Sequence, residues 1–409
     1  MNAFDTSNDA PGVVLTGATG FLGGELLARL LERDNRTIYA LVRARDDAEA
    51  EKRLRQTIVN LLGRAEPWTH RAVAIAADLT RPDMGLDGWQ REWLAGRAQQ
   101  IIHCAASVSF TLGLTESRRI NVEGTRRMID LARLADALGV LHCLTHVSTA
   151  YVAGTLHGTF TEDDLDVGQG FRNAYEGSKL EAELALRRYG RDLPIQVMRP
   201  SIVVGDSRTG WTSSFNVLYW PLRAFASGAY PALPARRSAP VDVVPVDYVA
   251  DAILALAGRP GTTYHLTASE QASSIGELVE LACARFERPA PRLLPPALYR
   301  YGLHPLLART GPSRRRKALR RSEAFFPYFN IAARYDNQRA RAALQGTGIE
   351  VPPLRAYFDR LVDYALRADW GHAPLPRHRL AGVAHPPRDR HHEGRRRSRP
   401  STGTHRVLR

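Results

Sequence analysis

The sequence predicts an α/β fold: a doubly wound parallel sheet, a smaller and mainly helical C-terminal part, and a disordered basic tail. Short apolar, β-branched runs alternate with helical patterns through the first two thirds of the chain. Strands separated by helices over such a length form a parallel sheet with helices on both faces. A glycine-rich turn directly follows the first apolar run, and the alternation loosens after Pro200.

The expected elements divide the chain into three parts. We expect strands at 13–16, 37–42, 73–77, 101–104, 141–147, 195–199 and 263–266. Helical patterns cover 25–31, 121–138 and 178–189, and Ser274 can cap a further helix that begins near Ile275. Residues 10–270 then form the main α/β domain, with an insertion at about 206–245 that supplies pocket loops. Residues 271–370 form the C-terminal substrate-binding region, and 371–409 form the tail.

The composition indicates a globular protein of a reducing compartment. Hydrophobic residues make up 44% and charged residues 24% of the 409 positions, as in ordinary folded domains. Segment 1–12 is polar and no apolar run approaches the length of a bilayer span, so we expect neither a signal peptide nor a membrane helix. The three cysteines have no metal-ligand spacing. They fit buried free thiols, which predicts the cytoplasm.

The net charge of +14 is largely local to the C-terminus. Segment 371–409 carries ten arginines against Asp389 and Glu393. It is rich in proline and histidine and lacks apolar periodicity, which predicts disorder. A solvated extension is the simpler interpretation, and an electrostatic contact with nucleic acid or anionic lipid is the alternative. No specific nucleic-acid partner is expected.

The glycine turn predicts a dinucleotide-binding site. Gly17, Gly20 and Gly23 have the spacing G-x-x-G-x-x-G between an apolar strand and a helix. The first glycine allows the tight turn, the second lets the backbone approach a pyrophosphate, and the third lets helix and strand pack closely. The free N–H groups at the helix start then face the phosphates. The other expected contacts of this turn are Thr16, Thr19, Phe21 and Leu22.

The end of the second strand favours NADPH over NADH. An NAD-binding fold normally has an acidic residue there for the ribose 2′-hydroxyl, whereas this chain has Arg43, with Arg45 close by. A guanidinium binds a 2′-phosphate through charge-assisted hydrogen bonds. Further cofactor contacts are expected after the third and fourth strands, at Asp78, Leu79, Ala105 and Ala106.

A hydroxyl cluster and a tyrosine–lysine pair predict catalysis. Tyr175 and Lys179 are spaced for one face of a helix. We expect the ammonium to lower the pKa of the phenol and to bind the ribose of the cofactor. Ser148 and Thr149 end an earlier strand, at the sheet edge where ligands bind. Either hydroxyl can donate to a carbonyl oxygen, and their chemistry does not separate them.

Together, these motifs resemble the extended short-chain dehydrogenase/reductases, which have a Rossmann fold. The resemblance covers roughly 12–270 and includes Thr16-Gly-Ala-Thr-Gly-Phe-Leu-Gly23, the hydroxyl cluster and Tyr175…Lys179. It implies that Thr149 is the catalytic hydroxyl, with Ser148 as its neighbour. It also implies that Asn121 organises a proton-relay water. The segment containing Pro200, Ser201 and Val203 is similar to the one that passes the nicotinamide, and Val244-Pro-Val-Asp247 matches a motif of the extended branch.

Longer phrases are similar to fatty acyl-CoA reductases and thioester-reductase domains. They include Ile102-His-Cys-Ala-Ala-Ser-Val-Ser-Phe110 and Asn173-Ala-Tyr-Glu-Gly-Ser-Lys-Leu-Glu-Ala-Glu183. This resemblance implies an enzyme that uses NADPH to reduce an acyl-CoA or carrier-bound acyl thioester to an aldehyde or alcohol. No adenylation or carrier domain is attached, and the region past residue 290 does not clearly match the helical domain of alcohol-forming reductases. The acyl chain, its carrier and the oligomeric state stay open.

Two other kinds of function compete with this interpretation. The first is another reaction of the extended family, by a 3β-hydroxysteroid dehydrogenase or a nucleotide-sugar epimerase; Arg43 argues against the NAD-dependent epimerase. The second is a non-catalytic, NADPH-sensing protein, which would not need Tyr175 and Lys179.

Segment 293–307 and the basic run Arg314-Arg-Arg-Lys317 can also lie on a membrane surface or receive an acidic carrier. A helical lid with a solvated basic face explains them equally well.

Overall fold

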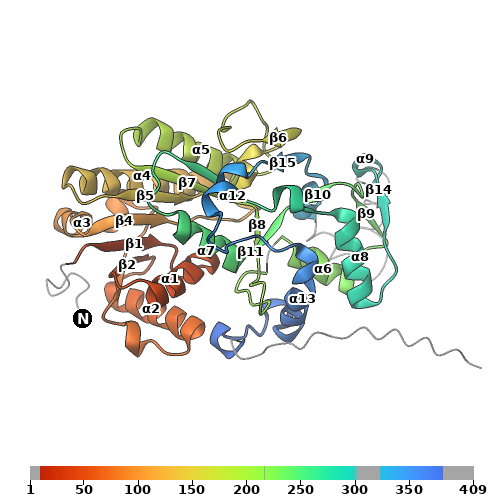
Figure 1. Cartoon of the computed structure of the whole chain (residues 1–409), viewed down its shortest axis with the longest axis horizontal. Helices are drawn as coiled ribbons and strands as arrows, with labels where there is room; N and C mark the ends of the chain where they lie inside the picture. Colours follow the sequence, from red (N-terminus) through yellow and green to blue (C-terminus); the bar gives the residue numbers. More distant parts are fainter. Residues whose placement is uncertain (1–9, 216, 300, 302–322, 381–409) are drawn as a thin grey trace, which may run out of the picture.

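A seven-stranded parallel sheet organises the molecule, in the order β12-β7-β5-β4-β1-β2-β3 (Figure 1). The structure, a computed structural model, describes residues 10–215, 217–299, 301 and 323–380. The strand order reverses between β1 and β4, which is the switch point where such sheets bind ligands. The strands are β1 (Gly12–Thr16), β2 (Ile38–Val42), β3 (Ala72–Ala76), β4 (Ala98–His103), β5 (Cys143–Val147), β7 (Ile195–Pro200) and β12 (Thr263–Leu266).

Helices cover both faces of this sheet, as the sequence predicts. In Figure 1, α3, α4 and α5 lie above the sheet and α1, α2 and α7 lie below it. The bounds above the sheet are α3 (Gly88–Ala95), α4 (Leu114–Ala137) and α5 (Ala174–Tyr189). Those below are α1 (Phe21–Arg33), α2 (Asp47–Leu62) and α7 (Val246–Leu256). The doubly wound α/β prediction is therefore confirmed.

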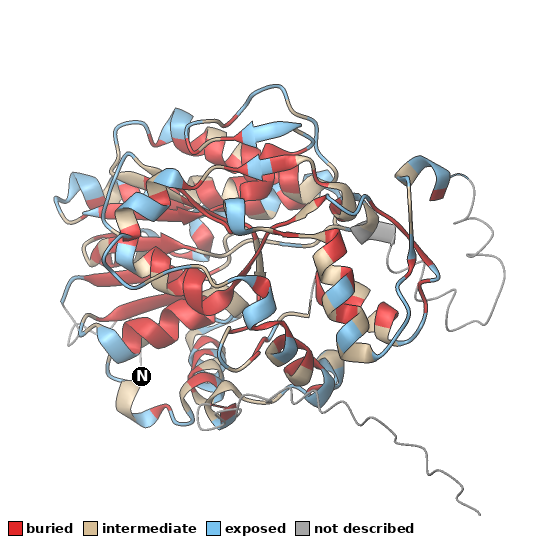
Figure 2. Ribbon diagram, turned by 45° about the vertical axis from the view of Figure 1, so that its right-hand side comes forward, coloured by how far each residue is buried: buried red, intermediate tan, exposed pale blue. Residues whose placement is uncertain are grey.

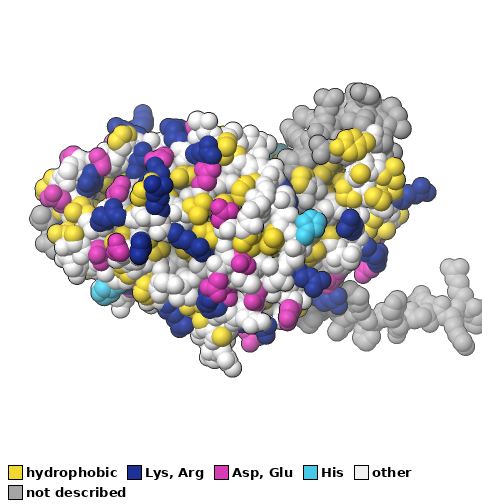
Figure 3. Space-filling model, turned by 90° about the horizontal axis from the view of Figure 1, so that it is seen from above, with side chains coloured by type: hydrophobic (Ala, Val, Ile, Leu, Met, Phe, Trp, Pro, Cys, Tyr) yellow, Lys and Arg dark blue, Asp and Glu magenta, His cyan; other side chains and the backbone are white. Residues whose placement is uncertain are grey.

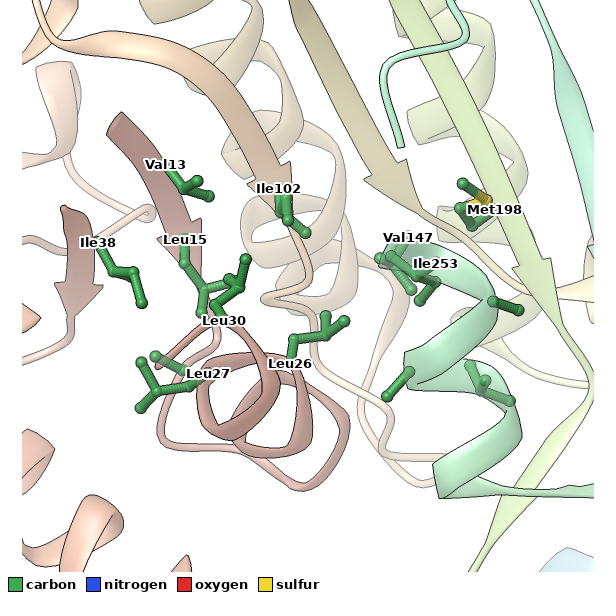
Figure 4. Close-up of a cluster of buried hydrophobic side chains, with 14 of the residues drawn as sticks. Val13, Leu15, Leu26, Leu27, Leu30, Ile38, Ile102, Val147, Met198 and Ile253 are labelled. Carbon is green, nitrogen blue, oxygen red and sulfur yellow. The ribbon is translucent and has the colours of Figure 1, made fainter. Parts of the chain in front are cut away.

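Apolar side chains fill the space between the sheet and its helices. The central strands are buried on both faces, which Figure 2 shows in red, and this explains why they read as continuous apolar runs. Below the sheet, Leu30 of α1 lies next to Leu15 of β1 (Figure 4), and Leu26, Leu27 and Val13 belong to the same buried cluster. All five side chains are almost fully buried. This packing fixes the helix that follows the glycine turn.

Short polar side chains start several of the helices. Asp46 accepts a hydrogen bond from the Glu49 N–H at the start of α2, and Asp87 forms a capping box with Gln90 at the start of α3. The predicted cap Ser274 accepts from the Glu277 N–H at the start of α8. Helix α4 begins at Leu114, earlier than the apolar pattern at 121 predicts. Its first turns are polar, so apolar periodicity is weak there although the backbone is helical.

The C-terminal part combines helices with short strand pairs. It forms the right-hand side of Figure 1, where α6, α8 and α13 lie beside β9 and β14. The sequence predicts mainly helices and loops here, and the strands that the structure adds pair only in twos: β8 with β11, β10 with β13, β9 with β14, and β6 with β15. The helices are α6 (Tyr219–Ala226), α8 (Ile275–Phe286), α9 (Pro296–Leu298), α12 (Gln338–Leu344) and α13 (Phe358–Arg367). The strands are β6 (Gly158–Phe160), β8 (Ile202–Val204), β9 (Ala232–Pro234), β10 (Pro240–Val241), β11 (Val243–Pro245), β13 (Ser273–Ser274), β14 (Arg292–Leu294) and β15 (Ala333–Tyr335). Short 3₁₀ turns complete the described chain at Glu66–Trp68, Pro82–Gly85, Ala150–Ala153, Ser269–Gln271, Glu323–Asn330, Leu354–Ala356, Asp369–Gly371 and Arg377–Leu380.

The first ten residues of the predicted tail are folded onto the domain. Leu380 is buried, and the carbonyl of Leu375 accepts hydrogen bonds from Trp211 Nε1 and the Tyr364 hydroxyl, each at 3.1 Å. Arg377 Nε lies 2.9 Å from Oε1 of the buried Glu25 on α1. Residues 371–380 therefore belong to the folded part, which the sequence does not predict because these contacts are long-range and the local composition is polar. Residues 381–409 lie outside the described part of the chain.

The distribution of charged side chains and the state of the cysteines can be compared with the predictions from composition. Acidic and basic side chains are interspersed over the α/β half in Figure 3, whereas hydrophobic side chains gather at the right-hand end. All three cysteines are free, and Cys143 is buried in β5. Among the described residues, no helix combines the length and apolar character that a bilayer crossing requires. The basic run 314–321 lies outside the described residues, as do residues 300 and 302–307 of segment 293–307.

The contact of Arg377 with Glu25 gives a stability prediction. We expect Arg377→Ala to lower the free energy of unfolding by about 1–3 kcal/mol, because a buried carboxylate loses one of its charged partners. The matched control is Arg379→Ala, which removes an exposed arginine of the same turn. Urea unfolding of both variants in the full chain measures the difference. Equal effects of the two substitutions would show that the Glu25 contact contributes nothing.

Candidate active site

The glycine turn between β1 and α1 forms a tight backbone cradle at the switch point. Gly17 has φ +78°, and a Cβ there would lie 2.9 Å from the Ala105 nitrogen. A Cβ on Gly23 would lie 2.1 Å from the Gly17 carbonyl oxygen. Gly20 begins α1 without a side-chain cap, so the N–H groups of the first helical turn face outward. Thr19 and Gly20 are exposed beside them, and Phe21 and Leu22 are partly exposed.

Thr16 joins the end of β1 to the end of β4. Its hydroxyl accepts hydrogen bonds from the Cys104 and Ala105 N–H groups, both at 3.1 Å, and contacts His103 Nδ1 at 2.8 Å. These hydrogen bonds hold Ala105 beside the glycine turn. Ala106 follows at the same carboxyl edge. The predicted contacts after the first and fourth strands are thus brought together.

The two predicted arginines differ in their surroundings. Arg43 is exposed directly after β2, and its charge helps to lower the pKa of Asp78. Arg45 is also exposed, and its Nε donates to Glu49 Oε2 at 2.9 Å. Partial burial raises the Asp78 pKa, but hydrogen bonds from Thr80 outweigh it and the net shift is downward. Leu79, the next residue, packs beside Gly124 of α4. Of the two predicted arginines, Arg43 is therefore the one whose charge acts on Asp78.

Tyr175 and Thr149 form the centre of the candidate active site. Tyr175 lies in the first turn of α5, which Asn173 caps by accepting from the Glu176 N–H at 3.1 Å. The Thr149 hydroxyl donates to the Pro200 carbonyl oxygen at 3.4 Å and lies close enough to the Tyr175 phenol to lower its pKa. Burial raises the pKa of Tyr175 to about 12, and the influence of Thr149 only partly offsets this. The prediction that Lys179 lowers the pKa of Tyr175 is therefore wrong for this structure. Desolvation of the phenol is the larger influence, and the phenol stays protonated at neutral pH.

Lys179 is buried one helical turn further along α5. Its Nζ donates to the Val147 carbonyl oxygen at 2.8 Å and lies 3.3 Å from His146 Nε2. Burial lowers the pKa of Lys179 to about 8, although Glu183 opposes the shift. Burial, together with the lysine charge, also lowers the pKa of His103 to about 3, so this imidazole stays neutral. The lysine is the charged group of an otherwise neutral buried cluster.

The structure separates Ser148 from Thr149. The Ser148 hydroxyl donates to Glu183 of α5 and is thus directed away from Tyr175. Glu183 is also bound by Arg199 Nη2 at 2.7 Å, and both side chains are buried. Ser148 therefore belongs to a buried ion-pair network beneath the site. Thr149 is the hydroxyl that influences the pKa of the phenol.

Asn121 and the segment after β7 complete the predicted set. The Asn121 amide nitrogen donates to the Ser178 hydroxyl at 2.9 Å and to the Ser107 carbonyl at 3.1 Å. It thereby ties the loop after β4 to the catalytic helix. Ser201 is buried after Pro200, and Val203 pairs with Val244 between β8 and β11. All the predicted catalytic residues thus lie around the carboxyl ends of β4, β5 and β7.

A partly open apolar cavity lies in the C-terminal part next to this site. Its walls come from α6, α8 and neighbouring strands and include Leu218, Phe225 and Val279. Two lining residues connect it to the catalytic groups. Ile202 is two positions after Pro200, and Tyr328 stacks on Phe110, whose ring centroid is 5.9 Å from that of Tyr175.

Several residues of the site are absent from the sequence prediction. Glu176, buried beside Tyr175, accepts a hydrogen bond at 2.7 Å from the Tyr328 hydroxyl, which is 152 positions later in the chain. A local sequence pattern cannot predict a contact between residues so far apart in the chain. Glu183 and Arg199 lie within predicted elements, and their burial depends on the strand order. Within the described ranges, no group of three or more His, Cys, Asp or Glu side chains could hold a metal ion.

Comparisons with known proteins agree on one family. The family model described as "Male sterility protein" matches residues 15–253. Human fatty acyl-CoA reductase 1 is 30% identical over 284 residues, which cover 61% of this chain and 55% of that protein. The isonitrile lipopeptide synthase of Streptomyces coeruleorubidus is 34% identical over 277 residues, or 66% of this chain and 18% of that protein. This chain spans at most about half the length of these curated relatives.

A solved structure covers almost the whole described fold. The terminal R domain of the myxalamid PKS-NRPS biosynthetic pathway superposes with a TM-score of 0.75 and 26% sequence identity, over 90% of this chain and 94% of that one. The reductase domain of a nonribosomal peptide synthetase from Mycobacterium tuberculosis has a TM-score of 0.64 at 23% identity, which supports the fold.

The two neighbouring hydroxyls give the next prediction. We expect Thr149→Ala to lower nicotinamide-dependent turnover by about 10²–10³-fold, because one donor at the reacting oxygen is lost. Ser148→Ala should instead lower the free energy of unfolding by about 1.5–3 kcal/mol, since a buried carboxylate loses a hydrogen bond. Its turnover should stay within about tenfold of wild type. Steady-state kinetics and urea unfolding of both variants test this; a larger turnover loss in Ser148→Ala would reverse the assignment.

Proposed function

The chain belongs to the male sterility protein family of extended short-chain dehydrogenase/reductases, and on that premise we propose that it reduces acyl thioesters with NADPH. The substrate is an acyl-CoA or an acyl group on a carrier protein. The product is the aldehyde, and a second reduction of the aldehyde gives the alcohol. The observation that carries this proposal is the grouping of Thr149, Tyr175 and Lys179 at the carboxyl edge of the sheet, beside an apolar cavity.

The residues at the switch point fit a nicotinamide dinucleotide. The cradle of Gly17 and Gly23 has no room for a Cβ, and the open first turn of α1 suits a pyrophosphate. Thr16 and Ala105 hold the neighbouring strand end, and Lys179 is near enough to the site to bind ribose hydroxyls. When bound, the cofactor supplies the hydride. The chain's own residues supply orientation and the proton.

The phenol is suited to donate a proton in the direction of reduction. Because burial keeps the pKa of Tyr175 well above neutrality, the hydroxyl carries its proton when a carbonyl oxygen arrives. Thr149 offers a second hydroxyl at the same oxygen, and two preorganised donors stabilise the negative charge that develops there. Collapse of the resulting thiohemiacetal breaks the carbon–sulfur bond and releases the thiol. Lys179 holds a positive charge behind Tyr175 below about pH 8.

The cavity supports an apolar acyl group as the substrate. Its lining is almost wholly aliphatic and aromatic, as in sites that bind extended apolar ligands. Ile202 and Tyr328 connect the lining to Pro200 and Tyr175, so a chain in the cavity would have its reactive end near the phenol. The names of two relatives point the same way: a fatty acyl-CoA reductase and a lipopeptide synthase. A nucleotide sugar is polar and would not need such a cavity.

Arg43 supports NADPH as the cofactor. We expect Arg43→Ala to raise the KM for NADPH by about 10–100-fold and to leave the KM for NADH within about threefold, since only NADPH carries the 2′-phosphate. The matched control is Arg45→Ala, which removes an equally exposed guanidinium that is paired with Glu49. Its effect should be smaller than about threefold. An equal rise in KM for both cofactors in Arg43→Ala would contradict a 2′-phosphate contact.

The reaction itself is tested by following NADPH absorbance with palmitoyl-CoA, a 3-ketosteroid and a UDP-sugar. We expect oxidation with the thioester alone, lowered by about 10³-fold in Tyr175→Phe because the proton donor is gone. Chromatography of the products distinguishes aldehyde from alcohol. If no acyl-CoA and no acylated carrier protein supports oxidation, the proposal is wrong; turnover of the steroid or the UDP-sugar would favour the alternatives.

A further inference from the structure

We propose that Tyr328 determines acyl-chain specificity, because its ring forms the wall between the apolar cavity and the catalytic tyrosine. This inference rests on the proposed function and names the residue through which the cavity and the reacting groups are connected. Tyr328 lies in the 3₁₀ turn Glu323–Asn330, far from α5 in the sequence, and it is buried.

A row of three rings leads from the cavity to the phenol. Tyr328 lines the cavity and stacks on Phe110, with ring centroids 4.8 Å apart and an angle of 6° between the planes. Phe110 in turn packs against Tyr175 at 5.9 Å. On its other side, the Tyr328 ring meets Tyr151 edge-on at 5.3 Å. The ring is therefore held on both sides, and it occupies the boundary between the two spaces.

The hydroxyl of Tyr328 fixes the ring to the start of the catalytic helix. It donates to Glu176 Oε1 at 2.7 Å and accepts from Asn173 Nδ2 at 2.7 Å. Asn173 caps α5, and Glu176 is fully buried and 3.4 Å from Arg172. Two hydrogen bonds to buried polar partners of the helix that carries Tyr175 leave the ring little freedom to rotate. The wall is thus rigid and attached to the catalytic element.

This position discriminates between acyl chains of different length. A chain whose carbonyl lies at Thr149 and Tyr175 reaches the cavity along Ile202 and Tyr328, the lining residues nearest to those groups. A short acyl group ends before this boundary, whereas a long one packs on the ring and enters the cavity. Each methylene buried there strengthens binding by about fourfold. Loss of the ring should therefore weaken the binding of long chains much more than that of short ones.

The kinetic test compares butyryl-CoA with palmitoyl-CoA in single preparations of the full chain. In Tyr328→Leu, we expect kcat/KM for palmitoyl-CoA to fall by at least about tenfold more than kcat/KM for butyryl-CoA, with the additional loss chiefly in KM. Tyr328→Phe keeps the ring and loses both hydrogen bonds, so its palmitoyl-CoA loss should be intermediate. The ratio of the two substrates is independent of how much protein is folded. Equal losses for both substrates, or no loss, would overturn the inference.

Tyr335→Leu is the matched control for this series. Tyr335 is also buried and packs edge-on against Tyr151 at 6.0 Å, but it does not line the cavity. Its replacement should lower both kcat/KM values by the same factor. A chain-length effect as large as that of Tyr328→Leu would show that general loosening of the aromatic cluster, and not the wall, sets the preference.

A binding measurement separates this inference from the proposed reaction. cis-Parinaric acid, a fluorescent long-chain fatty acid, should bind the wild type saturably and be displaced by palmitate but not by butyrate. Its affinity should fall by at least about tenfold in Tyr328→Leu and stay unchanged in Tyr335→Leu. If this pattern is found while no thioester is reduced, the reductase proposal fails and the role of Tyr328 stands. If thioesters are reduced but neither parinarate affinity nor chain preference depends on Tyr328, the inference fails and the reductase proposal stands.

Discussion

The buried ion pair between Arg199 of β7 and Glu183 of α5 is the interaction on which the site depends. Arg199 Nε lies 3.1 Å from both Glu183 oxygens, and Nη2 lies 2.7 Å from one of them. The attraction within such a pair offsets the free-energy cost of removing both charges from water only when their remaining polar atoms are also hydrogen-bonded. Ser148 meets this need at the carboxylate, and His265 Nε2 meets it at the guanidinium at 3.1 Å. These hydrogen bonds can form in only one position of α5 along β5 and β7. In that position, Tyr175 lies near Thr149.

The same burial sets the protonation states that reduction requires. A phenol and an ammonium close together in water would both move toward the phenolate–ammonium pair. Here desolvation is the largest influence on each group: it raises the pKa of Tyr175 to about 12 and lowers that of Lys179 to about 8. The phenol keeps its proton through the neutral range, so it is ready to act as a donor. Hydrogen bonding of Lys179 to a backbone carbonyl keeps its charge behind the phenol instead of in contact with it.

Local chemistry predicts the cofactor edge of the site, and long-range packing decides the rest. Gly17 and Gly23 are predictable because only glycine fits where the backbone comes this close. The strands and most helices follow from apolar periodicity, and the Ser274 cap follows from its side chain. The choice between Ser148 and Thr149 depends on Glu183, which sequence spacing does not place. The contact of Tyr328 with Glu176 joins segments 152 positions apart, and the folded segment 371–380 is polar in composition, so neither is visible in a local pattern.

These long-range contacts also connect the two halves of the molecule. Phe21, the first residue of α1, packs against Trp211 with ring centroids 5.8 Å apart, and Trp211 donates to the Leu375 carbonyl. Arg377 then reaches back to Glu25, one turn further along α1. Helix α1 is thus held by the C-terminal segment, as α5 is held by Tyr328. Because both helices are anchored by residues of the C-terminal part, that part does more than enclose a pocket: it fixes the position of α1, proposed to bind the cofactor, relative to α5, proposed to carry the proton donor.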